Sequence, residues 1–177
     1  ITVKRYQELL DELEAFRGGS RMLDVGCGDG HFLVVAKERG WEVYGTEYTP
    51  AAVEVCEKKG IRMCIGTLDD AGFSPASFDV ITSFEVIEHL PHPREEALRL
   101  FQLLRNGGCC YVTTPNFNSI SRRMLGSRWN VIEYPEHLGY FTRSSLKNLF
   151  TRAGFHYRRS ATTGISMDRV RVGLGGS

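Results

Sequence analysis

The run from Leu23 to Gly30, which reads LDVGCGDG, has the clearest chemical implication in the sequence. It holds three alternating glycines, which are Gly26, Gly28 and Gly30. Glycines in such a loop let the backbone approach a ligand closely and adopt positive φ angles. A dinucleotide site would use the spacing GxGxxG, whereas this chain has GxGxG and places His31 where the third glycine would stand. Asp24, before the first glycine, suits a ligand that carries an ammonium group and argues against a pyrophosphate.

Carboxylates also follow the next two expected strands. Glu47 lies at the expected end of the second strand, about twenty residues beyond the glycine loop, where a carboxylate can accept hydrogen bonds from both ribose hydroxyls. An ordinary exposed acid at a strand end is the alternative interpretation of Glu47. After the third expected strand, either Asp69 or Asp70 could meet an adenine amino group. The loop and Glu47 together predict a nucleoside-containing ligand.

A second group of reactive side chains is predicted around the segment from Glu85 to His89. Glu85, Glu88 and His89 have the i, i+3, i+4 spacing that places side chains on one side of a helical turn. With His137 they offer two carboxylates and two imidazoles, a reasonable ligand set for a divalent ion. In the alternative without metal, His89 caps a helix or acts as a general base and the glutamates are structural. The candidate catalytic residues are His89, Glu85 and His137.

These residues need a sheet whose strands end at one edge. Short apolar runs typical of buried strands cover residues 21–25, 42–46, 61–65, 78–82 and 109–113. Helical patterns cover residues 1–16, 31–39, 50–59 and 94–104, and a fifth runs from a cap at Thr142 or Ser144 to Ala153. We expect Gly107-Gly108 to stop the fourth helix and Gly154 the fifth. The alternation predicts an α/β fold: a Rossmann-like three-layer sandwich with a mostly parallel central sheet.

The chain length predicts a single domain over residues 1–177, because this length suits one full α/β core and not two ordinary domains. Between residues 117 and 147 the pattern loosens into Asn, Ser, Arg and aromatic residues, which is typical of a lid-like insertion on the substrate side. Trp129, Tyr134 and Tyr140 could form an acceptor pocket there or pack internally. Residues 155–161 and 165–172 are candidates for a final strand pair.

Composition narrows the class of protein. The chain is 42% hydrophobic and 24% charged, as soluble globular proteins are, and no apolar run approaches the roughly 18 residues that a membrane span requires. The five cysteines are odd in number and lack CxxC spacing, which predicts neither a disulfide framework nor a zinc site. We therefore expect a protein of the reducing cytoplasm.

The net charge of +1 is unevenly distributed along the chain. Residues 117–177 hold ten Lys and Arg against three Asp and Glu. This basic region is either a solvated face or a substrate region that attracts anions. Arg122, Arg123 and Arg128 would suit a phosphate or carboxylate on a substrate.

The chain resembles class I S-adenosylmethionine-dependent methyltransferases, in the branch that contains the ubiquinone-biosynthesis O-methyltransferases. The resemblance runs from about Met22 to Phe155 and rests on four ordered blocks: LDVGCGDG, FDVITSFEVIEHL at 78–90, LLRNGGCCYVTTPN at 103–116 and HLGYFTRSSLKNLFTRAGF at 137–155. Asn106 departs from the proline usual before the paired glycines, which should only loosen a turn.

The resemblance implies S-adenosylmethionine as the cofactor. Asp24 and the three loop glycines would then hold the methionine half, Glu47 the ribose, and Asp69 the region near adenine. Phe84 and Glu85 would border the methyl group. The expected cofactor-binding set is Asp24, Gly26, Cys27, Gly28, Gly30, Glu47, Tyr48, Asp69 and Phe84.

Four functions follow from these patterns. The leading one is a methyltransferase for a small molecule, directed to oxygen, which needs a base or a metal to deprotonate its acceptor. The second is a metal-dependent RNA 2′-O-methyltransferase, because the Glu85, Glu88, His89 and His137 pattern resembles the small-RNA 3′-terminal enzymes; the small net charge disfavours it. The third is a non-catalytic S-adenosylmethionine-binding module whose 117–147 segment holds a partner. The fourth, a dinucleotide oxidoreductase, conflicts with the glycine spacing. The methyl acceptor and the oligomeric state stay open.

Overall fold

The computed structural model describes residues 2–119 and 136–161. The chain forms two compact units. The larger unit comprises Ile1–Val86 with Leu98–Thr113, and the smaller unit comprises Ile87–Ala97 with Thr114–Ser177. That both belong to one domain over residues 1–177 stays a prediction. No helix in the described part of the chain has the length and apolar character to cross a membrane.

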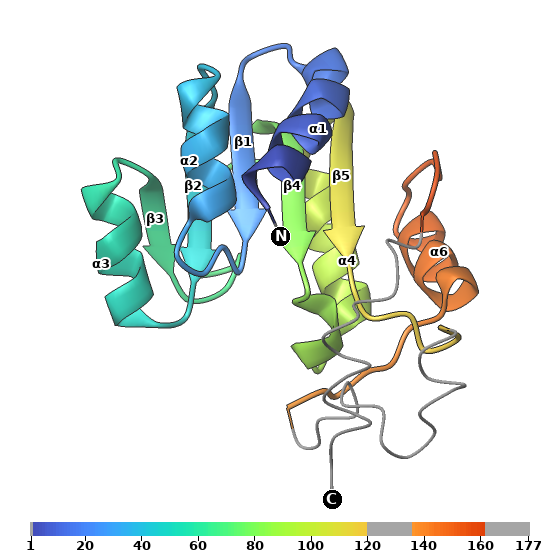
Figure 1. Cartoon of the computed structure of the whole chain (residues 1–177). Helices are drawn as coiled ribbons and strands as arrows, with labels where there is room; N and C mark the ends of the chain where they lie inside the picture. The colour runs from blue at the N-terminus through green and yellow to red at the C-terminus, as the bar shows by residue number, and fades with distance from the viewer. Residues whose placement is uncertain (1, 120–135, 162–177) are drawn as a thin grey trace, which may run out of the picture. The chain divides into compact units, whose positions relative to one another are not determined.

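A five-stranded parallel sheet forms the centre of the larger unit (Figure 1). Its strands are β1 (Arg21–Val25), β2 (Glu42–Glu47), β3 (Arg62–Ile65), β4 (Phe78–Phe84) and β5 (Leu104–Thr113). They lie in the order β3-β2-β1-β4-β5, so the direction of winding reverses between β1 and β4. Ligands of open parallel sheets bind beyond the carboxyl ends of the strands at such a reversal. The glycine loop follows β1 and therefore lies at this place.

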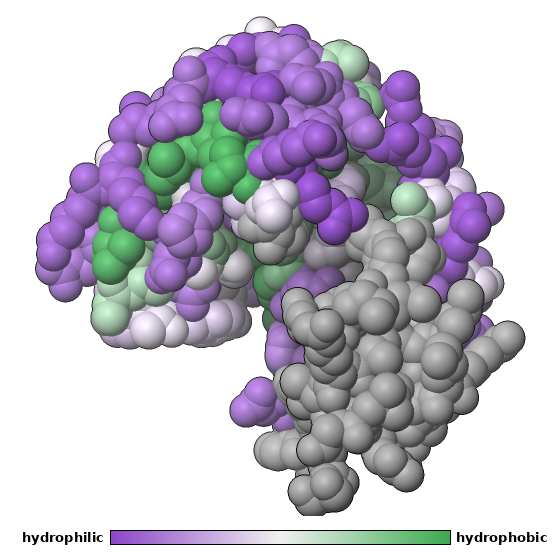
Figure 2. Space-filling view, in the orientation of Figure 1, coloured by the Kyte–Doolittle hydropathy of each residue, from purple (hydrophilic) through white to green (hydrophobic). Residues whose placement is uncertain are grey.

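The helices are α1 (Val3–Leu13), continued by η1 (Glu14–Phe16), then α2 (His31–Glu38), α3 (Pro50–Lys58), η2 (Ile87–His89), α4 (Pro93–Leu103) and α6 (Arg143–Arg152). Helix α1 is amphipathic: Leu10 and Leu13 are buried, and its outer face is hydrophilic in Figure 2. Helix α3 begins at Pro50, whose fixed φ angle and missing N–H suit the first helical position.

Apolar side chains pack on both faces of the sheet. On one face Leu10 of α1 and Leu33 of α2 pack with Met22 and Val80 of the sheet. On the other face Tyr44, Phe73 and Phe78 meet in edge-to-face ring contacts, and residues 98–103 of α4 lie behind the strands (Figure 1). The predicted Rossmann-like sandwich with a parallel sheet is confirmed.

Asp79 closes the amino-terminal edge of the sheet, where the strands begin. Its buried carboxylate accepts backbone hydrogen bonds from Gly18 (3.1 Å), Gly19 (3.0 Å) and Arg21 (2.8 Å), and pairs with the Arg105 guanidinium. Burial alone would raise the pKa of Asp79, but the hydrogen bonds from Gly19, Arg105 and Arg21 outweigh it and hold the pKa below its ordinary value. This carboxylate therefore has a structural role.

The junction of α4 and β5 differs from the sequence prediction. Helix α4 ends at Leu103 and β5 follows at once, so Gly107 and Gly108 lie within the strand. The pairing with β4 shifts register between Phe78 and Val80, and Gly107 has a φ of +79°. The prediction that Gly107-Gly108 stops a helix is therefore wrong: the glycines accommodate an irregularity in the strand.

The last helix begins and ends where the sequence predicts. Thr142 caps α6 in a capping box, in which the Ser145 amide donates to the Thr142 hydroxyl (3.1 Å) and the Thr142 amide donates to the Ser145 hydroxyl (2.9 Å). Gly154 follows the helix with a φ of +108°. Residues 155–161 form no strand, so this half of the predicted pair is wrong, because Tyr157 packs against α6 instead. Residues 165–172 lie outside the described residues.

Candidate functional site

The glycine loop joins β1 to α2 at the carboxyl edge of the sheet. Gly26, Gly28 and Gly30 have φ angles of +66°, +52° and +69°. A Cβ atom built on Gly28 would meet no described atom within 4 Å. Gly28 therefore borders open space, where a ligand can approach the backbone.

The other two glycines are required by the packing of the protein itself. A Cβ on Gly26 would lie 2.6 Å from Cγ2 of Val86. One on Gly30 would lie 2.6 Å from Cδ1 of Ile61 and 2.8 Å from Sγ of Cys56. The sequence predicts one ligand-binding role for all three glycines. In the structure, Gly28 is the one of the three that has open space beside its backbone.

Glu47, the last residue of β2, reaches across to the glycine loop. Its Oε2 accepts a hydrogen bond from the Gly28 amide (3.0 Å), and its Oε1 accepts from the amides of Tyr48 (2.8 Å) and Thr49 (3.2 Å). Each carboxylate oxygen has two acceptor lone pairs, so Oε1 is fully used and Oε2 keeps capacity for one further donor. The structure thus brings Glu47 and Gly28 together, while the Tyr48 side chain beside them is exposed.

Asp24 lies buried in β1, one strand away from Glu47. The Thr82 hydroxyl of β4 donates to its Oδ1 (2.7 Å). Burial raises the pKa of Asp24 to about 7, and the hydrogen bond from Thr82 only partly opposes this. A cation near Asp24 would favour the ionised carboxylate. Thr82 is a site residue that the sequence did not reveal, because it meets Asp24 only through the register of β1 and β4.

Cys27 contributes backbone and packing to the loop. Its amide donates to the Thr46 carbonyl (3.1 Å), and its Sγ lies 3.9 Å from Sδ of Met63. Burial raises the pKa of the Cys27 thiol, so the neutral thiol persists and is a poor nucleophile. The Cys56 thiol of α3 donates to the Gly28 carbonyl (3.2 Å), and this hydrogen bond holds the glycine loop to α3. A cofactor contact of Cys27 stays a prediction.

Asp69 and Asp70 both have protein partners. Asp69 forms an ion pair with Arg99 of α4 (2.5 Å). Asp70 accepts hydrogen bonds from the hydroxyl (2.6 Å) and the amide (2.7 Å) of Thr67, which hold the pKa of Asp70 below its ordinary value. Asp70 therefore organises its own turn, and the adenine contact of Asp69 stays a prediction.

Phe84 ends β4 within an aromatic cluster. Its ring lies 5.1 Å from Phe32, 5.8 Å from Tyr111 and 6.3 Å from Tyr6, centroid to centroid. Tyr6 comes from α1, and both burial and the nearby Asp24 charge raise the pKa of its phenol. The cluster gives the carboxyl edge of β4 an apolar wall.

Glu85 departs from its predicted conformation. It has a φ of +55°, and its amide donates to the Thr113 carbonyl (3.1 Å). The helical turn starts only at Ile87, as the short helix η2. The prediction that Glu85, Glu88 and His89 share one helical turn is therefore wrong for Glu85, because a left-handed residue cannot belong to that turn.

Glu88, His89 and His137 lie together in the smaller unit. One potential ligand atom from each lies within 4.8 Å of the others. Backbone contacts create this arrangement, since the amides of Leu138 and Gly139 donate to the Glu88 carbonyl (2.8 and 2.9 Å). The predicted meeting of His137 with the Glu88-His89 pair is therefore found in the structure, and Glu85 is not a member of the group.

The surroundings of this cluster orient its side chains. Glu88 is buried, and its Oε2 accepts a hydrogen bond from the Thr114 hydroxyl (3.0 Å). His89 directs Nδ1 to the Glu136 carbonyl (2.9 Å), so Nδ1 is the donor and Nε2 remains for a metal or a proton. One carboxylate and two imidazoles suit a divalent transition metal. The residues present fit such an ion.

Part of the expected substrate region is outside the described residues. This applies to Arg122, Arg123, Arg128, Trp129 and Tyr134. Tyr140 is described, and its ring lies 5.4 Å from Phe117 and 6.1 Å from His137. An acceptor pocket between residues 117 and 147 stays a prediction.

Comparison with known proteins places the chain in a family. A family model described as a methyltransferase domain matches residues 2–160. A ubiquinone biosynthesis O-methyltransferase of Idiomarina loihiensis is 33% identical over 107 residues, which cover 56% of this chain and 44% of the relative. One from Cereibacter sphaeroides is 28% identical over 148 residues, or 77% of this chain and 60% of the relative. The chain spans about half the length of the curated relatives it matches.

Solved structures share the fold. The YcgJ protein of Bacillus subtilis has a TM-score of 0.75 at 20% identity, covering 98% of this chain and 79% of that chain. A SAM-dependent methyltransferase of Archaeoglobus fulgidus has a TM-score of 0.71 at 19% identity, covering 97% and 84%. With the family match over most of its length, the chain belongs to the methyltransferase-domain family.

Proposed function

We propose that the protein transfers a methyl group from S-adenosylmethionine to an oxygen of a small molecule in the cytoplasm. The observation that supports this most strongly is the open space at Gly28 beside the Glu47 carboxylate, at the switch point of a parallel sheet. The oxygen acceptor is supported by the relatives named ubiquinone biosynthesis O-methyltransferases. The cytoplasmic location is proposed from the five cysteines, which are odd in number and lack CxxC spacing.

The residues of the larger unit would divide the work of holding this ligand. Glu47 accepts a hydrogen bond from a ribose hydroxyl at its Oε2, and Gly28 lets the ligand approach the backbone. Asp24 faces the positively charged amino-acid end, where its carboxylate balances the ammonium group. When bound, S-adenosylmethionine supplies an electrophilic methyl group. The chain's main task is to position this group in line with the acceptor, because positioning provides much of the acceleration.

Calorimetry with S-adenosylmethionine tests this assignment. Glu47→Ala should weaken binding by about 1.5 to 3 kcal/mol, the typical loss for a hydrogen bond to a charged group. Glu54→Ala, which removes an exposed acid of α3 paired with Lys58, is the matched control and should leave affinity unchanged. Equal affinity of wild type and Glu47→Ala would refute the ribose role. Binding without release of S-adenosylhomocysteine from any acceptor mixture would indicate a binding module.

A metal-assisted reaction is a second candidate, which the cluster of Glu88, His89 and His137 favours. A divalent ion held by these three would lower the pKa of an acceptor hydroxyl. Without a metal, His89 or His137 would act as the general base, because a neutral imidazole has a nitrogen lone pair that can accept the proton of the acceptor hydroxyl. A catalytic role for Glu85 rests on its position after β4.

Removal of divalent ions separates these mechanisms. If the cluster holds a metal, EDTA should abolish turnover, added Mn²⁺ or Zn²⁺ should restore it, and His137→Ala should prevent the restoration. Activity that is insensitive to EDTA and to added ions would exclude the metal mechanism, and with it the RNA 2′-O-methyltransferase hypothesis. A small-RNA acceptor tested beside phenolic acceptors would decide between the two substrate classes.

A further inference from the structure

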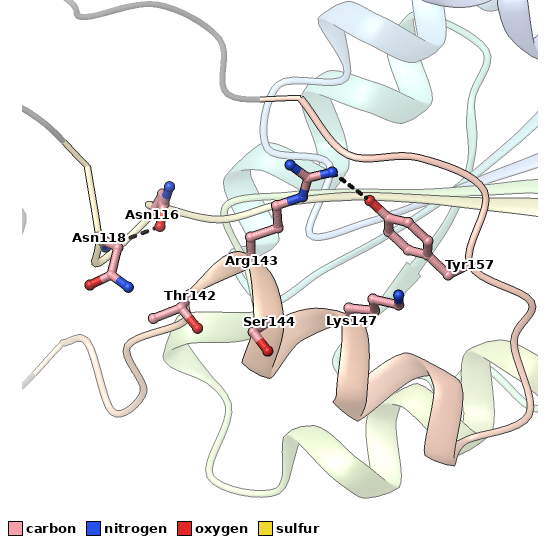
Figure 3. Close-up of a pocket in the computed structure, with 7 residues that line it drawn as sticks. All are labelled: Asn116, Asn118, Thr142, Arg143, Ser144, Lys147 and Tyr157. Carbon is pink, nitrogen blue, oxygen red and sulfur yellow. Dashed lines mark hydrogen bonds between the residues drawn. The ribbon is translucent and has the colours of Figure 1, made fainter.

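The smaller unit contains a pocket whose described lining includes none of the residues to which the proposed function assigns a role. Its volume is about 460 Å³ (Figure 3). That size lies within the range of small-molecule sites. The lining residues come from the segment after β5, the start of α6 and the segment after α6; they are Asn116, Asn118, Thr142, Arg143, Ser144, Lys147 and Tyr157.

The described part of the lining has two cations and no acid. Arg143 donates from Nη2 to the Tyr157 hydroxyl (3.2 Å), and the Lys147 ammonium lies 4.6 Å from the centre of the Tyr157 ring. Tyr157 thus holds both cations at the pocket, as the Arg143 contact in Figure 3 illustrates. The first turn of α6 has no acidic residue. The described lining therefore leaves two positive charges without a carboxylate among them.

The positions of the two cations are electrostatically unfavourable while the pocket holds no ligand. Arg143 and Lys147 are four residues apart on one helix, so their like charges repel each other. Arg143 also opens α6, where the helix dipole favours negative charge. The capping box of Thr142 and Ser145 already satisfies the helix start, so the two side-chain cations are the main attraction for a ligand. An anion in the pocket would offset both repulsions.

The hydrogen bonds and charges around the Tyr157 hydroxyl also favour an anion in the pocket. Its hydroxyl is hydrogen-bonded to Ser160 (2.7 Å) as well as to Arg143. The pKa of Tyr157 is lowered, first by the Ser160 hydrogen bond and then by the Arg143 hydrogen bond, with the charges of Arg143 and Lys147 adding to the effect. Positive surroundings that favour a phenolate also favour a bound anion.

We propose that this pocket binds the phosphoryl group of a small phosphate monoester. A phosphoryl dianion matches two cations, and its oxygens can accept hydrogen bonds from several donors at once. Ser144 provides a hydroxyl, and Asn116 provides its amide N–H groups because its Oδ1 already accepts from the Asn118 amide (3.0 Å). The pocket volume leaves room for the organic part of the ester. The proposal does not depend on methyl transfer.

Calorimetric titration of the full chain with phenyl phosphate and inorganic phosphate tests this pocket. Wild type should bind phenyl phosphate. It should bind benzoate at least tenfold more weakly, because the carboxylate makes about one fewer charged hydrogen bond than the phosphoryl group. Arg143→Gln and Lys147→Gln should each weaken phenyl phosphate binding about tenfold or more. Arg152→Gln is the matched control, because Arg152 is a cation of the last turn of α6 that does not line the pocket. Circular dichroism establishes that each variant is folded.

Several results would overturn the proposal. One is the absence of phenyl phosphate binding by the folded wild type, and another is equal weakening in Arg152→Gln. Benzoate binding as tight as phenyl phosphate binding would make the pocket a carboxylate site. Sedimentation with phosphatidylglycerol vesicles that needs Arg143 and Lys147, without binding of the soluble ester, would assign the cations to a lipid surface. Because S-adenosylmethionine binding is measured separately, failure here leaves the methyltransferase assignment unaffected.

Discussion

Two buried carboxylates stand at opposite edges of the same sheet, in neighbouring strands. Asp79 of β4 lies at the amino-terminal edge and accepts hydrogen bonds from three backbone amides and the Arg105 guanidinium. Asp24 of β1 lies toward the carboxyl edge and, among the described residues, receives one hydrogen bond, from Thr82. The pKa is lowered for Asp79 and raised to about 7 for Asp24.

The difference separates a structural edge from the proposed ligand-binding edge. At the amino-terminal edge the protein supplies all the donors and a countercharge, so the carboxylate is stable as an anion. At the carboxyl edge Asp24 is buried, no cation among the described residues accounts for its charge, and its strand leads into the loop that contains the open Gly28 position. A buried acid with a raised pKa beyond the switch point of the sheet is what the proposed function requires of Asp24, because the ammonium group of the ligand would supply the missing positive charge.

The largest effect in this comparison is expected from loss of the Asp79 carboxylate, and it is an effect on the free energy of unfolding. Asp79→Ala should lower the free energy of unfolding by about 3 to 5 kcal/mol, because it removes the hydrogen bonds from three backbone amides and the Arg105 guanidinium, each of which contributes roughly 1 kcal/mol. Asp24→Asn should cost far less, since an amide keeps the Thr82 contact and carries no buried charge. Urea unfolding of both variants near neutral pH measures the difference. Similar destabilisation by the two changes would show that both acids are structural.

The raised pKa of Asp24 predicts a dependence of stability on pH. Its folded pKa is about 7, whereas an unfolded Asp has a pKa of about 3.9. Below about pH 4 the acid is protonated in both states and costs nothing; between about pH 4 and 7 only the unfolded state ionises, so stability falls as pH rises. The full loss above pH 7 is on the order of 4 kcal/mol, from about three pKa units at 1.36 kcal/mol each.

Comparison of wild type with Asp24→Asn isolates this effect from the other acids. Unfolding at about pH 5 and about pH 8 should show a stability advantage of the variant that grows with pH. A constant difference between the two proteins would mean that Asp24 titrates normally. Bound S-adenosylmethionine should reduce the effect, because its positive charge lowers the pKa of Asp24.

The smallest expected effect distinguishes two glycines of the loop. Gly30→Ala should destabilise the fold by about 2 to 3 kcal/mol, through positive-φ strain and contact with Ile61 and Cys56. Gly28→Ala should cost only the strain of about 1 to 2 kcal/mol, yet should weaken S-adenosylmethionine binding. Thermal unfolding and calorimetry on both variants test this. Greater destabilisation by Gly28→Ala would contradict the open space at that position.

Fold likeness alone leaves the chemistry open. Function is therefore decided by the side chains of the site and not by the sandwich that holds them. The Glu47, Asp24 and His137 variants examine those side chains directly.

Local sequence determined the strands, most helix limits and the glycine loop. The apolar runs, Pro50 at the start of α3 and the Thr142 cap of α6 act on their chain neighbours, so their effects can be read in order. For the same reason Glu47 was identified as a strand-end acid. The failures at Gly107-Gly108 and Glu85 occurred where a bulge and a left-handed residue interrupted a regular pattern.

Tertiary structure alone decided which groups meet. It set Thr82 against Asp24, left Gly28 open while Val86 filled the space at Gly26, and brought His137 to Glu88 and His89. These contacts join residues far apart in the chain, and their geometry depends on strand order, register and packing. Periodicity and spacing describe only neighbours along the chain, so they cannot specify such contacts.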